Sequence, residues 1–95
     1  MTEWTGEKLA NYLQKEYGTS DPIKLAKIYG FNFRYHNFDD SDPAFYIAGI
    51  NGRKDIYLST SIPNNQIPFY IGQQLGRYLL YNPDQIEKGD NNGIL

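Results

Sequence analysis

The sequence contains no cysteine and no valine, and it has only one methionine, one tryptophan and one histidine, His36. Without cysteine the chain forms neither a disulfide nor a thiolate metal site. With one histidine it cannot build, within one copy, the two-histidine zinc site of a metallopeptidase. The absence of cysteine also suits a reducing compartment, so we expect a cytoplasmic protein.

Long apolar runs and an excess of basic residues are also missing. No window approaches the roughly 18 apolar residues that a membrane span requires, and the N-terminal MTEWTGEKLA lacks the apolar segment of a signal peptide. We therefore expect no membrane contact. The formal net charge of -2 and the scattered Lys and Arg residues disfavour binding to a nucleic-acid backbone.

Aromatic residues are abundant, with nine tyrosines and five phenylalanines in 95 residues. This length is typical of one domain, so we assign residues 1–95 to a single unit with an aromatic, Ile- and Leu-rich core. The last segment, NPDQIEKGDNNGIL, carries two glycines and few apolar groups. We expect residues 82–95 to form a frayed tail.

Apolar periodicity and turn residues divide the chain into six elements. Asp21 and Pro22 start the second helix and Gly30 stops it, whereas Asn51-Gly52 is typical of a tight hairpin turn. The expected helices are 3–17 (capped by Thr2 or Thr5), 21–30 and 67–81, and the expected strands are 31–36, 45–50 and 54–59. This pattern predicts an α+β fold of order ααβββα, with helices packed on a three-stranded, mainly antiparallel sheet.

The segment Ile67–Tyr81, IPFYIGQQLGRYLLY, is the longest apolar run at helical period. Apolar residues recur there every fourth position, as expected for a helix with one buried face capped by Asn64 or Asn65. The stripe consists of Ile67, Ile71, Leu75 and Leu79. We expect it to face the strand residues Phe33, Tyr35, Ile56 and Leu58.

The opposite face of this helix carries Gln73, Gln74 and Arg77 at the spacing of a His-Glu-x-x-His metallopeptidase motif. The run resembles the active-site helix of the ImmA/IrrE family of metallopeptidases at Phe69, Leu75, Gly76, Tyr78, Leu79 and Leu80. The resemblance extends from residue 21 to residue 81 through DPIKLAKIYGF and FYIAGINGRKDIYLSTSI. It implies a small zincin-like core.

The resemblance also implies that the peptidase chemistry has been lost. Gln73 and Arg77 replace the two histidine ligands, and Gln74 replaces the glutamate that activates water. Glutamine is a poor zinc ligand, arginine is a cation, and an amide is not a base. Glu87 has no surroundings like those of the family's acidic ligand. We therefore expect no metal, no cofactor and no catalysis, and a vacated cleft closed by Gln73 and by an Arg77 guanidinium bonded to a neighbouring oxygen.

These observations favour a noncatalytic module that binds another protein. Members of the family often control phage or mobile-element repressors, or lie beside helix-turn-helix regulators, so the resemblance implies a partner of that kind. Homodimerisation stays open. An alternative is an enzyme that uses the cleft-lining Tyr46 and His36 with Gln74 and Arg77 in a non-zinc reaction; another is a nucleic-acid-associated regulator.

The acidic residues Asp39, Asp40 and Asp42 fit a solvated turn better than a calcium loop.

The first testable prediction concerns metal content. We expect the purified protein to carry no stoichiometric zinc and to be indifferent to chelators, because neither imidazole pair nor base is encoded. Elemental analysis before and after chelation measures this. Stoichiometric zinc whose removal abolishes an assayable activity would contradict the loss of peptidase chemistry.

Overall fold

The computed structural model describes residues 3–38 and 41–89. Within these ranges, no helix is long and apolar enough to cross a membrane. The elements, in chain order, are α1 (Gly6–Tyr17), α2 (Pro22–Ile28), β1 (Asn32–His36), β2 (Ala44–Ile50), β3 (Arg53–Ser59), the 3₁₀ helix η1 (Asn64–Gln66), α3 (Ile67–Tyr81) and the 3₁₀ helix η2 (Pro83–Lys88).

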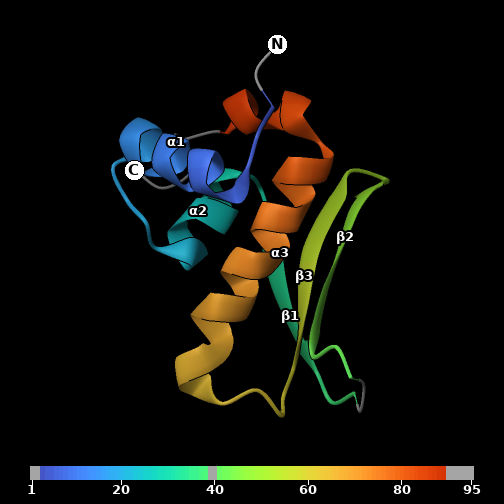
Figure 1. Ribbon diagram of the computed structural model, residues 1–95. Coiled ribbons are helices and arrows are strands. Elements are labelled where there is room, and N and C mark those ends of the chain that lie inside the picture. The colour runs from blue at the N-terminus through green and yellow to red at the C-terminus, as the bar shows by residue number, and fades with distance from the viewer. Residues whose placement is uncertain (1–2, 39–40, 90–95) are drawn as a thin grey trace.

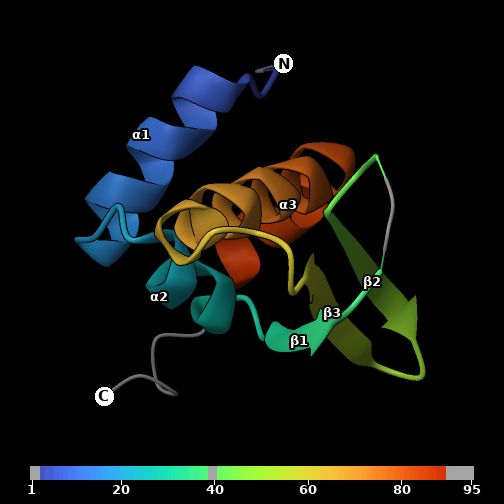
Figure 2. The ribbon, with the colours of Figure 1, turned by 90° about the horizontal axis from the view of Figure 1, so that it is seen from below.

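The elements form an α+β structure of two layers, and the predicted order ααβββα is confirmed. All three α-helices lie on one side of the sheet, with α3 nearest to it and α1 farthest from it (Figures 1 and 2). The other side of the sheet carries no helix of the described chain. The fold thus leaves one sheet face without a covering layer.

The sheet is mixed rather than mainly antiparallel, with strand order β1-β3-β2. The β2–β3 hairpin is antiparallel, as expected, but β3 lies between the other two strands and runs parallel to β1. The chain leaves β1, crosses to the far edge of the sheet, and returns through the hairpin into the centre. Because the hairpin reverses direction, β3 takes the direction of β1.

Local sequence signals set most of the boundaries. Thr5 caps α1 by accepting a hydrogen bond from the Lys8 N–H (3.2 Å), so this helix begins at Gly6 rather than at residue 3. Asp21 caps α2 as predicted, accepting from the Ile23 N–H (3.0 Å), and α2 ends at Ile28. Side-chain oxygens at these positions satisfy backbone donors that have no partner within the helix.

The hairpin turn follows from two residues that tolerate left-handed backbone angles. Asn51 and Gly52 have φ values of 51° and 74°. Two consecutive positive φ values define the tight turn whose twist matches that of paired strands. The Asn-Gly dipeptide therefore fixes the register in which β2 pairs with β3.

The core lies between α3 and the sheet and extends to the inner faces of α1 and α2. Ile71, Leu75 and Leu79 are buried as predicted, and so are Ile56 and Leu58 of the central strand. Tyr78 joins them and packs edge-to-face on Phe31, with ring centroids 5.1 Å apart. These contacts hold α3 at a fixed rotation over the sheet.

Two expected details of this packing are wrong. Tyr35 is 51% exposed. It lies on β1, an edge strand that has a neighbouring strand, β3, on one side only. Neither Asn64 nor Asn65 caps α3. The chain instead enters α3 directly from η1, with Gln66 already in a helical conformation (φ -102°, ψ -10°), so no extended capping residue precedes the helix.

The prediction of a frayed tail from residue 82 is wrong for residues 83–88, which form η2. Ile86 is fully buried against the helices. The Tyr29 hydroxyl donates a hydrogen bond to the Ile86 carbonyl oxygen. One apolar side chain in an otherwise polar segment therefore anchors it. Residues 90–95 lie outside the described chain.

A buried contact of α3 gives a stability prediction. We expect Leu75→Ala to lower the free energy of unfolding by about 2–5 kcal/mol, because Leu75 is buried in the core and its loss leaves a cavity. Urea denaturation measures the change. Phe69→Ala is the control, since Phe69 is exposed on the same helix and its truncation should cost less than about 0.5 kcal/mol. Equal effects of both substitutions would show that Leu75 is not in the core.

Candidate functional site

An open groove of about 410 Å³ runs between α3 and the pair α1 and α2. Most of its walls are leucine, alanine, proline and glycine. Its polar lining side chains are Ser20, Gln73 and Arg77. The apolar walls are Gly6, Leu9, Ala10, Leu13, Pro22, Leu25, Gly72, Leu75, Gly76 and Leu80. A volume of this size suits side chains of a peptide or a small molecule.

Two glycines of α3 shape the groove. At Gly72 a Cβ atom would lie 3.3 Å from Pro22 Cβ, so the missing side chain lets α2 approach α3 closely. At Gly76, one turn later, a Cβ atom would meet no other atom within 4 Å. Gly72 therefore permits close packing of α2 on α3, whereas Gly76 leaves unfilled space in the groove wall.

Gln73 and Arg77, which we expected to fill a vacated metal position, line this groove one turn apart. Both side chains are exposed. The guanidinium of Arg77 has no hydrogen bond or ion pair with any residue in the described ranges, contrary to the bonded group that we expected. Solvent access removes the need for a protein partner. The groove is therefore open, and not closed by these two side chains.

Gln74, where we expected a lost catalytic base, points to the other side of α3. The residue is only 2% exposed, and its Nε2 donates a hydrogen bond to the carbonyl oxygen of Ala44 at 3.3 Å. Ala44 is the first residue of β2. The amide thus links α3 to an edge strand, a role that requires a hydrogen-bond donor at this position.

The structure does not bring Tyr46 and His36 together. Tyr46 faces α3, packs edge-to-face on Tyr78 at 5.8 Å, and lines a second hollow of about 440 Å³ with Lys54 and Asn82. Burial raises the pKa of the Tyr46 hydroxyl above its ordinary value of 10.0. His36 lies on the opposite face of the sheet, with its ring 5.6 Å from that of Tyr57.

Metal-ligating side chains are not gathered anywhere in residues 3–38 and 41–89. No group of three His, Asp or Glu residues is close enough to hold an ion there. Glu87 is exposed on η2. Of the acidic turn, Asp39 and Asp40 lie outside the described residues. The groove itself offers one hydroxyl, one amide and one guanidinium, a set that binds anions or carbonyl groups rather than cations.

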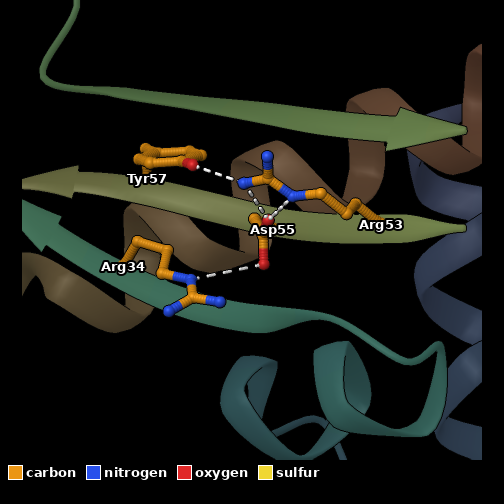
Figure 3. Close-up of polar contacts among 4 residues, drawn as sticks. All are labelled: Arg34, Arg53, Asp55 and Tyr57. Carbon is orange, nitrogen blue, oxygen red and sulfur yellow. Dashed lines mark hydrogen bonds and ion pairs between the residues drawn. The ribbon is translucent and has the colours of Figure 1, made fainter. Parts of the chain in front are cut away.

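A charged cluster that we did not expect lies on the uncovered sheet face (Figure 3). Arg53 donates two hydrogen bonds to Asp55 Oδ2, at 2.9 Å from Nε and 2.7 Å from Nη2, and Nη2 also donates to the Tyr57 hydroxyl at 2.7 Å. Arg34 reaches Asp55 Oδ1 from the neighbouring strand at 3.5 Å. The sequence signal for this cluster is the placement of Arg53, Asp55 and Tyr57 at every second position of β3, because such residues share one face of a strand.

The hydrogen bonds from Arg53 hold the pKa of the Asp55 carboxyl below its ordinary value of 3.8, and the nearby charges of Arg53 and Arg34 act in the same direction. The carboxylate therefore stays ionised while its side chain is only 2% exposed. One carboxylate neutralises one of two guanidinium groups. Within the described chain, the cluster retains one positive charge.

Comparison of the chain with protein-family models, with curated proteins and with solved structures gave no match.

The buried amide gives a prediction on charge. We expect Gln74→Glu to destabilise the fold by about 2–3 kcal/mol at neutral pH, because a buried carboxylate would face the Ala44 carbonyl with no donor between them. Burial would raise the pKa of the new carboxyl above about 4.3. Stability would be retained below that value, where the protonated group can donate, and lost as the pH rises through the raised pKa.

Thermal melts between acidic and neutral pH measure this difference. Gln73→Glu is the matched control, since it makes the same chemical change at an exposed position of the same helix. A Gln74→Glu variant as stable as Gln73→Glu at neutral pH would show that the amide is not a structural link.

Asp55 gives a second pH prediction. Because its pKa is lowered by folding, the carboxylate contributes stability above about pH 3.8, and this contribution is lost as the pH falls through the lower folded value. Asp55→Asn should therefore lower the melting temperature at neutral pH and flatten the acid limb of the stability curve. Glu16→Gln, at an exposed position of α1, is the control. An acid limb of unchanged steepness in Asp55→Asn would exclude this carboxylate as its source.

Proposed function

We propose that this chain is a noncatalytic protein-binding module, similar in fold to the ImmA/IrrE metallopeptidases, whose groove receives an apolar segment of another protein. The observation that carries the proposal is the open apolar groove beside Gln73 and Arg77, the two positions that would hold metal ligands in a peptidase. Because Gln73 and Arg77 are poor metal ligands, the groove is suited to binding another protein and not to metal-dependent catalysis.

The groove has the chemistry of a docking site for an amphipathic helix. Its leucine side chains come from three helices and form apolar walls, and the exposed guanidinium of Arg77 lies at the same groove. A partner helix would place apolar side chains at helical spacing into the groove, with a carboxylate one turn away against Arg77. Such an arrangement joins apolar burial, which supplies affinity, to one charge pair, which fixes the orientation.

The resemblance suggests which partner to test. We propose a regulator of a phage or mobile element, with a helix-turn-helix repressor as the leading candidate and the cytoplasm as the place of encounter. Helical repressors present amphipathic helices, which the groove suits. No specific arrangement of His36, Tyr46, Gln74 and Arg77 favours the alternative of an enzyme, since His36 lies on the far face of the sheet.

A substitution that fills the groove tests the proposal. We expect Gly76→Leu to weaken partner binding by about tenfold or more, because its side chain would extend into space that is empty in the groove wall. Gly76→Ala is the matched control: it should preserve binding and stabilise α3 by about 0.5–1 kcal/mol, since alanine suits a helix interior better than glycine. Capture from a lysate of the host, with quantitative mass spectrometry of each variant, measures the effect.

The proposal is supported when the same protein is captured by the wild type and Gly76→Ala but lost with Gly76→Leu, while both variants keep the wild-type melting transition or exceed it. Capture that is equal for all three would move the binding site away from the groove. Light scattering at two concentrations shows in parallel whether the partner is a second copy of the chain.

A further inference from the structure

The uncovered face of the sheet carries a row of aromatic rings beside the Arg34–Arg53–Asp55 cluster. The rings of Phe45 and Tyr57 lie 4.8 Å apart at an interplanar angle of 9°, so they stack face to face across β2 and β3. Phe38 contacts Phe45 at 5.6 Å on one side. Phe45 is 42% exposed, and no helix of the described chain covers it.

Phe45 and Tyr57 each cover one face of the other ring, and Phe38 and His36 flank them on the outer sides, so the two central rings present their edges to solvent. Coplanar rings lying flat on the sheet would have centroids farther apart than 4.8 Å. Figure 3 shows the ring of Tyr57 nearly edge-on, on the side of the sheet away from α3. Ring edges carry partial positive charge, whereas ring faces carry partial negative charge. The aromatic row therefore adds to the positive character of its surroundings.

The neighbouring cluster supplies a full positive charge. The side chains of Arg34 and Arg53 are 54% and 49% exposed, while Asp55, which they share, is 2% exposed. A ligand approaching this face thus meets two guanidinium groups and not the carboxylate between them. Across the sheet, Arg34 pairs in register with Tyr57, which in turn pairs with Phe45. Cationic and aromatic groups form one continuous strip.

We propose that this strip binds an acidic segment of another protein, at a surface separate from the groove. Carboxylates of the segment contact Arg34 and Arg53, and apolar side chains next to them lie along the edges of Phe45 and Tyr57. An extended segment with an acidic residue at one position and an apolar residue two positions later matches the strip, because the side chains on one face of an extended chain are every second residue and repeat at roughly 6.5–7 Å. The charge complementarity selects an acidic partner.

A single-stranded nucleic acid is the competing anionic ligand, and the geometry disfavours it. Base-stacking sites offer exposed ring faces, but Phe45 and Tyr57 cover one face of each other, and Phe38 and His36 lie beside the two rings on their other sides. The chain also has a net charge of -2, which opposes a polyanion more than a short acidic peptide.

Three probes separate these ligands: a short peptide whose every second residue is in turn glutamate and leucine, with serine between them, the same peptide with lysine for glutamate, and oligothymidylate. Amide chemical-shift mapping with isotope-labelled protein gives the binding surface, and fluorescence anisotropy gives the affinity. We expect the acidic peptide to bind, with shifts centred on β1, β2 and β3. Preference for the lysine peptide or for oligothymidylate, or shifts confined to the groove between α1 and α3, would overturn the proposal.

Variants assign the affinity to the strip. Arg34→Gln should weaken binding of the acidic peptide about fivefold, the upper range for an exposed charge pair, and it leaves Asp55 bonded to Arg53, which preserves the fold. Lys24→Gln, an equal change of charge at an exposed position of α2, should have no effect. Equal losses in both variants would mean that only net charge matters and would refute a site on the sheet.

Phe45→Ser tests the aromatic row, and Gly76→Leu separates this surface from the groove. Phe45→Ser should weaken the acidic peptide without lowering the affinity of a groove partner, whereas Gly76→Leu should do the reverse. Loss of peptide binding in Gly76→Leu would place the peptide in the groove and refute the proposal. Binding of the groove partner is measured separately, so the two sites can fail independently.

Discussion

Burial of α3 between the sheet and the helices α1 and α2 is the constraint on which the rest of the structure depends. Ile71, Leu75 and Leu79 are buried in one core cluster with Ile56 and Leu58 of the sheet. At roughly 25 cal/mol for each Å² of apolar surface removed from water, such contacts dominate the stability of a small domain. They fix the rotation of α3 about its axis. This rotation sets the direction in which all the remaining side chains of α3 point.

The directions of Gln73, Gln74 and Arg77 follow from that rotation. Gln74 is turned toward β2, where its amide links helix and strand, while Gln73 and Arg77 face the groove beneath α1 and α2. The same helix thus separates a structural polar group from two exposed ones. A buried amide can be satisfied by a backbone carbonyl, whereas a buried guanidinium needs several acceptors, so the positively charged residue lies on the solvated side.

A two-layer fold also leaves both a groove and a bare sheet face. The helices gather on one side of the sheet, and the hydrogen-bonded cluster of Arg34, Arg53 and Asp55 lies on the other. These surfaces differ in chemistry: the groove is lined mainly by aliphatic groups, and the sheet face carries aromatic edges and guanidinium groups. The described chain therefore presents two chemically different surfaces on opposite sides of the sheet.

Periodicity and local signals were sufficient for the elements and their order. Ile67–Tyr81 is an α-helix over the predicted residues, Asp21 and Pro22 start α2, and Asn51-Gly52 closes the hairpin. Each depends on interactions within a few residues. The ordered segment Pro83–Lys88 was not foreseen, because its order depends on Ile86 meeting α-helices from the other end of the chain and on a hydrogen bond from Tyr29.

By itself the sequence determined the elements and the chemistry that is present: three helices and three strands, and at residues 73, 74 and 77 of the third helix two amides and a guanidinium. Only the tertiary structure decided where that chemistry lies. The parallel placement of β3 beside β1 brings Arg34 to Asp55, and the rotation of α3 buries Gln74 but exposes Arg77. Strand order and helix rotation depend on contacts between distant segments, which local periodicity does not encode.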